Sequence, residues 1–356
     1  MTDFKTNGLP LLIGSLPITS HEKATRLILD STPEIPLWPQ LPAYREEGMI
    51  SQFVSGMPGL AGSLETRQFI DTSSPEFDRD YLAFYEEYLS VTDDNDRLDT
   101  SRFTLTPETG RGFREFLKQI DLNPGACRAL KGQVSGPITF ATGVRDQNDR
   151  AIFYNDQLRD AAIKHLALHG QWQARQFSRR GLKPIVFFDE PALAGFGTSA
   201  FITISREDVA EAIREVIQGV HLEDGLAGVH VCANTEWDLL LDSDIDIISF
   251  DAFSFFDRFI LYPRGIKAFL NRGGILAWGI VPTSDAATIA GESTGSLCRN
   301  LESQFRQVEA LGFGRQQILE QALITPSCGT GSLDLDSALT VLRLTGEVSR
   351  GIRGIA

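Results

Sequence analysis

Gly228-Val229-His230-Val231-Cys232 is an apolar stretch that ends in a His-x-Cys pair, and it decides how the rest of the chain is interpreted. The stretch predicts a strand, and residues two apart on a strand point to the same face, so His230 and Cys232 can bind one metal ion. A second apolar stretch, Ile324-Thr325-Pro326-Ser327-Cys328-Gly329, contains another cysteine at its end. Two thiolates and an imidazole form a soft ligand set that prefers zinc and leaves room for a further ligand. The sequence therefore predicts a zinc site on two strand ends and metal-assisted chemistry on a sulfur substrate.

Short apolar stretches alternate with longer amphipathic segments along the chain, which is typical of repeated βα units. Eight strands are predicted, at residues 10–16, 35–41, 128–135, 184–188, 227–232, 245–250, 275–280 and 322–326. Helical patterns lie between them, at residues 22–29, 156–178, 206–220, 256–271, 296–311 and 335–348. Eight such units most simply close into a single (β/α)8 TIM barrel, an α/β fold. Two separate domains are the alternative, but no Pro/Ser-rich linker marks a boundary.

Residues 52–125 are too many for a βα loop, and they carry helical patterns of their own at 78–88 and 107–120. We therefore expect one barrel domain over residues 1–356, with 52–125 as a helical insertion between strands 2 and 3 that covers the barrel mouth. The acidic run Asp93-Asp94-Asn95-Asp96 lies in this insertion. It lacks the ligand spacing of a calcium loop and is interpreted as a solvated turn.

Composition excludes several classes of protein. The 356-residue chain is 42% hydrophobic and has a net charge of -14, which argues against broad binding to nucleic acid or to anionic membranes. No apolar run approaches the ~20 residues of a membrane span, and the N-terminus, Met1-Thr2-Asp3-Phe4-Lys5, has no signal-peptide pattern. The 4 cysteines are too few for a disulfide scaffold in a chain of this length. These features predict a cytoplasmic protein with neither nucleic-acid nor membrane partners.

Residues able to carry chemistry follow the predicted strands at their carboxyl ends. They are Gly14, Ser15, Gln40, Asp189, Glu190, His230, Cys232, Asp251 and Cys328. In a barrel these ends gather at one face, where active sites are built. Asp189 and Glu190 are the predicted catalytic residues, because two carboxylates at a barrel mouth are expected to meet a substrate. Asp251 is open to two interpretations, as a fourth metal ligand or as the cap of the following helix.

Five motifs, in order along most of the chain, resemble the catalytic half of cobalamin-independent methionine synthase, in the superfamily that also holds uroporphyrinogen decarboxylase. They are Ile13-Gly14-Ser15, Gly136-Pro137-Ile138-Thr139, Asp189-Glu190-Pro191-Ala192, His230-Val231-Cys232 and Cys328-Gly329. The resemblance implies that zinc is held by His230, Cys232, Cys328 and a carboxylate at the position of Asp251, where the larger enzymes have a glutamate. It also implies a homocysteine site formed by Ile13, Gly14, Ser15 and Asp189. Gln40, at the end of the second predicted strand, completes the predicted substrate-binding residues.

Three departures from the family pattern concern the methyl donor. The additional N-terminal barrel of the long enzymes is absent, the tryptophan that stacks on folate is replaced near Thr142-Gly143, and the proton-donating histidine has no counterpart in residues 278–282. The chain is thus more similar to the short "core" methionine synthases. The resemblance implies zinc-dependent transfer of a methyl group to the thiol of L-homocysteine from methylcobalamin or a methylated corrinoid protein, rather than from folate.

Three alternatives stay open. A corrinoid-dependent methyltransferase acting on another thiol, such as coenzyme M, would share the His/Cys/Cys set but would not need Asp189, since that acceptor has no ammonium group. A metal-free decarboxylase of the uroporphyrinogen type needs basic groups for its many carboxylates, and an acidic mouth with zinc-type cysteines argues against it. A non-catalytic, zinc-stabilised binding protein would have a closed site that takes up no thiol.

Overall fold

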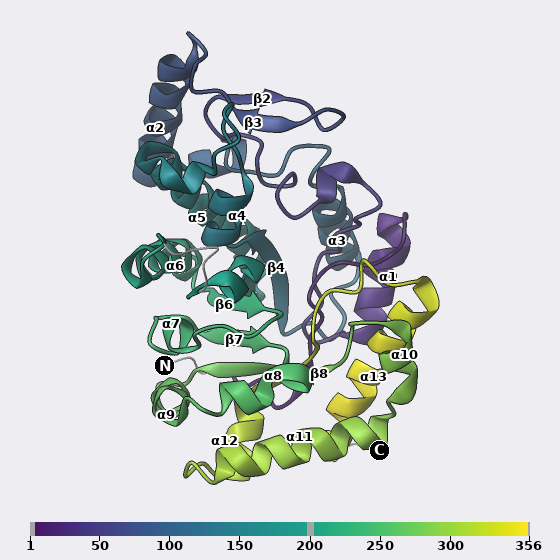
Figure 1. Cartoon of the computed structure of the whole chain (residues 1–356). Helices are drawn as coiled ribbons and strands as arrows, with labels where there is room; N and C mark the ends of the chain where they lie inside the picture. Colours follow the sequence, from purple (N-terminus) through teal and green to yellow (C-terminus); the bar gives the residue numbers. More distant parts are fainter. Residues whose placement is uncertain (1–3, 198–202, 355–356) are drawn as a thin grey trace.

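The computed structural model describes residues 4–197 and 203–354. The first three residues of the chain, which belong to the stretch that has no signal-peptide pattern, lie outside these ranges. Seven strands form one parallel sheet in the order β1-β9-β8-β7-β6-β5-β4. They are β1 (Leu9–Pro10), β4 (Ala129–Ser135), β5 (Lys183–Asp189), β6 (Leu226–Val231), β7 (Ile247–Phe250), β8 (Ile275–Val281) and β9 (Ala322–Pro326). The sheet curls, and the helices lie along its outside (Figure 1).

The helices between and around these strands agree with the predicted βα alternation. They are α1 (His21–Ser31), α2 (Phe77–Asp93), α3 (Arg111–Leu122), α4 (Pro137–Gly143), α5 (Asp156–Ser178), α6 (Arg206–His221), α7 (Asp238–Leu241), α8 (Ala252–Phe259), α9 (Pro263–Asn271), α10 (Ala286–Gly291), α11 (Thr294–Glu309), α12 (Arg315–Glu320) and α13 (Leu335–Ile352). The single helix predicted over 256–271 is two helices, because Pro263 cannot continue α8 and instead begins α9.

The second predicted strand, residues 35–41, is not a regular strand, so the eight-stranded barrel is confirmed only in part. Pro36 and Pro39 interrupt it, and proline has no backbone N–H to donate to a ladder. Two isolated parallel bridges join it to its neighbours, Leu37 with Lys131 and Gln40 with Ser15. The fold is a TIM-barrel-like half-barrel of seven strands, with this irregular segment, which we call the seam (residues 35–41), lying between β4 and the chain after β1.

Alternation along the strands separates two cores. In β5, Ile185 and Phe187 belong to a buried cluster with inward residues of the other strands, whereas Val186 and Phe188 pack in the larger cluster beneath the helices. Because side chains alternate between the faces, Asp189 is the next inward residue after Phe187. Asp189 pairs in register with His230 of β6. The alternation thus places both side chains on the inward face, and the register places them at the same end of the sheet.

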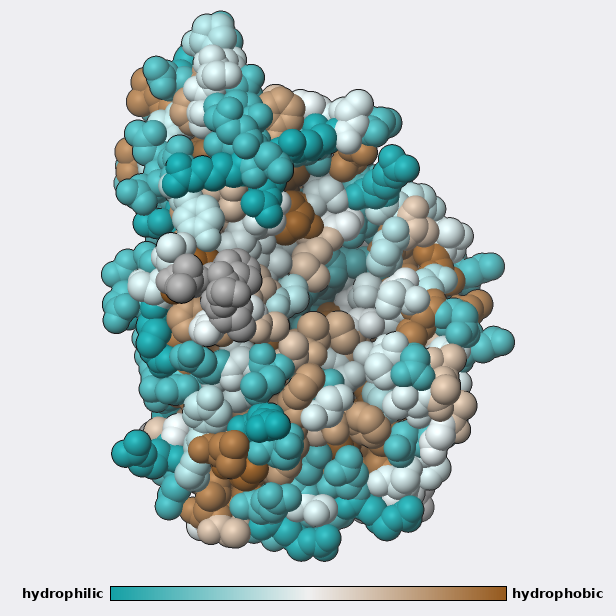
Figure 2. Space-filling view, viewed as in Figure 1, coloured by the Kyte–Doolittle hydropathy of each residue, from teal (hydrophilic) through white to brown (hydrophobic). Residues whose placement is uncertain are grey.

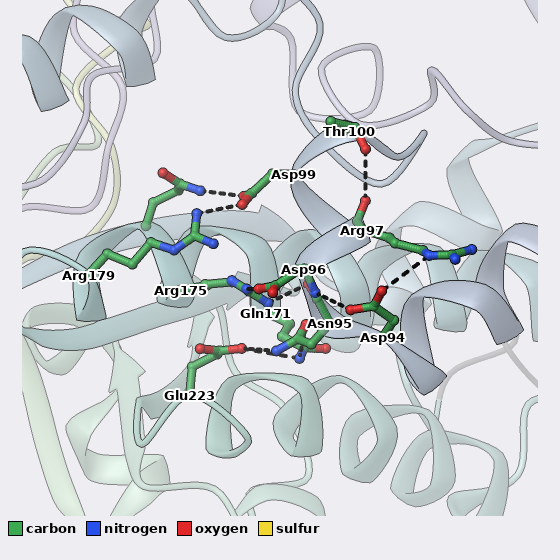
Figure 3. A network of polar contacts seen from close by, with 11 residues as sticks. Asp94, Asn95, Asp96, Arg97, Asp99, Thr100, Gln171, Arg175, Arg179 and Glu223 are labelled. Carbon is green, nitrogen blue, oxygen red and sulfur yellow. Dashed lines mark hydrogen bonds and ion pairs between the residues drawn. The ribbon is translucent and has the colours of Figure 1, made fainter.

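Residues 52–125 contain α2, α3, the hairpin β2 (Leu60–Gly62) and β3 (Gln68–Ile70), and the 3-10 helix η2 (Asn95–Thr100). Ion pairs tie η2 to α5, between Arg175 and Asp96 and between Arg179 and Asp99 (Figure 3). All four residues of the acidic run are exposed, as expected of a solvated turn, and Asp96 in addition forms an ion pair with Arg175 of α5. Cover of the barrel mouth by the whole insertion stays a prediction.

Hydrophilic residues dominate the edges of the surface in the view of Figure 2, with hydrophobic residues gathered toward its middle and lower left. No helix within the described ranges is long and apolar enough to cross a membrane.

Candidate metal centre

Three donor groups converge where β6 and β9 end. His230 lies on β6, Cys232 follows that strand directly, and Cys328 follows β9. One ligand atom from each of the three residues lies within 4.8 Å of the other two. Strands β7 and β8 stand between β6 and β9 in the sheet, so the curvature of the sheet is what brings Cys328 to His230. The residues that the sequence singled out as a metal-binding set are therefore together in space.

The imidazole of His230 is oriented for a further ligand. Its Nδ1 lies 3.0 Å from the hydroxyl of Ser249 on β7. Its Nε2 is buried and has no hydrogen-bond partner among the described residues. A buried polar atom without a partner costs on the order of 1–3 kcal/mol, and a metal ion would satisfy it. The residues present therefore fit zinc, with Ser249 holding the ring from the opposite side.

The two cysteines share one hydrogen bond, and it moves their pKa values in opposite directions. The Cys328 thiol, followed by His230, lowers the pKa of Cys232. The hydrogen bond to Cys232 raises the pKa of Cys328, and burial raises it further. One of the two sulfurs is thus favoured as a thiolate, the form that binds a metal.

A cavity of about 380 Å³ opens beside these donors. Its lining includes all of the predicted substrate-binding residues and three of the four predicted metal ligands: Ile13, Gly14, Ser15, Gln40, Asp189, His230, Cys232 and Cys328. Met49, Phe53 and Pro191 give part of its wall an apolar character. The structure therefore combines a sulfur-rich donor set with a chamber of small-molecule size.

The turn at residues 13–15 is packed tightly against the loop that carries Cys328. The Ser15 hydroxyl accepts a hydrogen bond from the Gly331 N–H at 3.1 Å, and the Ser15 carbonyl accepts one from the Thr330 N–H at 3.0 Å. A Cβ at Gly329 would lie 2.2 Å from the Ser15 Oγ, so any larger residue there would displace that hydroxyl. The Cys-Gly pair thus supplies both a candidate metal ligand and the close approach that fixes this turn.

Asp189 is a buried carboxylate with spare hydrogen-bonding capacity. Its Oδ1 is buried without a partner in the described part of the chain. Burial raises its pKa, while Lys131 and His230 act in the opposite direction. An anionic group with an unpartnered oxygen at a cavity wall is suited to receive a cationic ligand.

Glu190 is not among the residues that line the cavity, and its predicted catalytic role stays a prediction. Its carboxylate accepts hydrogen bonds from the N–H groups of Ile138 at 2.8 Å and Thr139 at 2.9 Å, and from the Thr139 hydroxyl at 2.7 Å. It therefore occupies the N-terminus of α4, where a negative charge is favourable. A Cβ at Gly136 would lie 2.2 Å from this carboxyl group. Burial raises the pKa of Glu190 to about 7, against the effect of these hydrogen bonds.

Asp251 lies next to the centre but outside the group of three. Its Oδ1 accepts a hydrogen bond from the Ser254 N–H at 2.8 Å and thereby caps α8. Burial raises its pKa, and the nearby Cys232 adds to that effect. The capping interpretation describes what the structure shows, and the fourth-ligand role stays a prediction.

Lys131 and Ser249 were missed from the sequence. Both are fully buried and lie on inward positions of β4 and β7. A lysine at an inward position of a predicted strand, between buried Ala129 and Gln133, was a usable signal because isolated buried charges are rare.

Comparisons with known proteins bear on the fold. No protein-family model matches the chain, and no curated protein matches it. A B12-independent methionine synthase from Shewanella sp. W3-18-1, solved in complex with selenomethionine, aligns with a TM-score of 0.55 and 15% identity, over 97% of this chain and 98% of that one. A methyltransferase from Methanosarcina mazei aligns with a TM-score of 0.42 and 12% identity over 67% of this chain and 66% of that one, too weakly to support an argument. The chain thus has the fold that its motifs implied, that of a B12-independent methionine synthase.

Proposed function

We propose that this chain is a zinc-dependent methyltransferase that methylates the thiol of L-homocysteine to form methionine. The observation that carries the proposal is the convergence of His230, Cys232 and Cys328 on a cavity that Asp189 also lines. Zinc bound to two thiolates and one imidazole would supply an open position at which a substrate thiol is held as the thiolate.

The chain's own residues would bind and orient the amino acid around that thiol. Asp189 would pair with the substrate ammonium through its unpartnered oxygen. The Gly14 backbone and the Ser15 hydroxyl would bind the carboxylate, since that hydroxyl accepts from Gly331 and keeps its own proton to donate. In the transfer a sulfur–carbon bond forms and the methyl–donor bond breaks. Its electron pair stays with the donor, and the thiol proton passes to solvent.

The proposed donor is methylcobalamin or a methylated corrinoid protein. It would enter the cavity along the apolar part of its wall, which includes Met49, Phe53 and Pro191. We further propose that residues 52–125 cover this mouth. Phe53 supports that arrangement, because it belongs to the insertion and lines the cavity. The name of the structurally similar synthase describes a B12-independent enzyme, so the experiment below includes a folate arm.

The test measures methionine formation by the zinc-loaded protein from homocysteine with either methylcobalamin or methyltetrahydrofolate. We expect turnover with methylcobalamin and none with the folate. Turnover with folate alone would contradict the donor assignment and leave the acceptor assignment intact. A parallel assay offers coenzyme M, which has a sulfonate and no ammonium group for Asp189. Methylation of coenzyme M in preference to homocysteine would reject the proposed acceptor.

A further inference from the structure

The ammonium group of Lys131 lies inside the half-barrel, beneath the cavity. Its Nζ donates to the Ile13 carbonyl at 2.5 Å and to the Gln133 Oε1 at 3.4 Å, and it lies 4.6 Å from the centre of the Phe187 ring. The residue is 0% exposed. A charge so deeply buried is costly, and these three contacts, together with the nearby charge of Asp189, compensate it.

The position of Lys131 relates it to the seam. Its backbone N–H donates to the Pro36 carbonyl at 2.9 Å, on one side of the irregular segment. Its side chain reaches the Ile13 carbonyl, in the chain that pairs with the other side of that segment through Ser15 and Gln40. One residue thus links β4 to the stretch after β1, where a regular eighth strand would otherwise set the spacing.

The carbonyl that Lys131 holds belongs to the cavity wall. Ile13, Gly14 and Ser15 all line the cavity, and the loop after Cys328 fixes the far side of Ser15. Lys131 is absent from that lining and touches the turn only from below. It therefore acts on a ligand through the turn and through its positive charge, and does not act by direct contact.

We propose that Lys131 is the positioning residue of the carboxylate subsite: by holding the Ile13 carbonyl it fixes the turn of residues 13–15 in the form that binds a substrate carboxylate. The inference rests on the proposed function, because it names the part of the acceptor that this turn would recognise. Burial lowers the pKa of Lys131 to about 8, so the side chain is mainly cationic at neutral pH.

The experiment compares wild type with Lys131→Met, which keeps a similar chain length and removes the charge. The matched control is Ile247→Met, another inward substitution on β7, away from the turn. Calorimetry gives the Kd of zinc-loaded protein for homocysteine, for 4-mercaptobutyrate, which lacks the ammonium, and for 3-aminopropane-1-thiol, which lacks the carboxylate. Amide hydrogen exchange of residues 11–16 reports on the turn without any ligand.

We expect Lys131→Met to raise the Kd for both carboxylate thiols about tenfold, the size associated with one lost charge-assisted interaction. The Kd for 3-aminopropane-1-thiol should rise by a smaller factor, because Lys131 also lowers the pKa of Asp189, the proposed ammonium partner. The zinc content and the behaviour of Ile247→Met should match wild type. Exchange of residues 11–16 should be faster only in Lys131→Met.

Two results would overturn the inference: unchanged exchange at residues 11–16, or an equal loss of affinity for all three thiols. The second would mean that Lys131 supports the barrel in general. If wild type binds none of the three thiols, the proposed function fails, and the exchange experiment still decides whether Lys131 holds the turn. Lys131→Gln serves as a second variant, with the same expected split, should the methionine variant fold poorly.

Discussion

Two buried regions of this molecule contain histidines with a ring nitrogen that has no partner, and they differ in what surrounds them. In the candidate metal centre, the free Nε2 of His230 lies beside two sulfurs and a cavity. In α5, His165 and His169 lie 3.1 Å apart between their Nε2 atoms, and the Nδ1 of each is unpartnered. The rings of Phe53, Phe84, Phe103 and Phe140 surround this second pair.

The two regions share an unpartnered imidazole nitrogen, and they differ in the further donor atoms that lie around it among the described residues. Within the described residues, neither histidine of the α5 pair belongs to a group of three side chains that could hold a metal ion. Burial lowers the pKa of His165 to about 4 and that of His169 well below its usual value, which keeps both rings neutral. At His230 the neighbouring thiols make the same kind of nitrogen useful for binding a metal ion.

The largest expected effect comes from substitutions that disrupt the candidate metal centre and leave the α5 pair unchanged. Cys232→Ser and Cys328→Ser should each abolish zinc retention and methyl transfer together, because only the thiolates supply strong soft ligands. Elemental analysis of the purified variants, loaded with zinc and desalted, measures this. Cys298→Ser is the matched control, since Cys298 lies on α11 outside the group of three. Wild-type zinc content in both ligand variants would refute the assignment.

An intermediate effect concerns the α5 pair and sharpens the contrast. Because the folded pKa of His165 is lowered from 6.5 to about 4, the unfolded chain binds more protons between those values. The free energy of unfolding should therefore fall as the pH drops from about 6.5 through 4 and be insensitive to this group above 6.5. The loss should be about 3 kcal/mol larger in wild type than in His165→Gln, measured by denaturant unfolding across that range. Parallel pH profiles for the two proteins would contradict this, and zinc content should be the same in both.

The smallest expected effect concerns Asp251, which lies next to the candidate metal centre. Asp251→Asn keeps a good helix cap, so stability should change by only a few tenths of a kcal/mol and zinc content should be retained. Asp251→Ala should cost about 1 kcal/mol through the lost cap. A zinc titration decides the matter: a loss in Asp251→Asn as large as that of the cysteine variants would establish Asp251 as a fourth ligand.

The sequence was sufficient for features that depend on local periodicity. Short apolar stretches located β4 to β9 within a few residues, and the ends of those stretches placed His230 and Asp189 at the same face of the barrel. The seam was wrongly predicted as a regular strand because residues 35–41 have the apolar character of a strand. Pro36 and Pro39 have no backbone N–H groups to donate to the hydrogen bonds of a strand ladder. Strand propensity and hydrogen-bonding capacity are separate properties, and the apolar pattern of residues 35–41 reports only the first.

The placement of the three candidate metal ligands could be predicted from the sequence, whereas the roles of the carboxylates could be predicted less well. A histidine and two cysteines have few alternative uses at strand ends, so their placement could be inferred from type and spacing. A carboxylate serves equally well as a ligand, a catalyst or a cap, and only the structure shows Glu190 on α4 and Asp251 on α8. The role of Lys131 depends on a contact with a residue 118 positions away in sequence, which no local pattern reports.

The seam also has a consequence for engineering the acceptor range. Side-chain amides support the barrel there: Gln133 donates to the Trp38 carbonyl at 2.8 Å, Gln173 donates to the Gln133 carbonyl at 2.9 Å, and the Trp38 indole donates to Gln173 at 2.8 Å. The circumference of the half-barrel beside the chamber is thus set partly by three side chains, whose hydrogen bonds are additional to those of the regular ladders. A library aimed at bulkier acceptors would start with these two glutamines and this tryptophan.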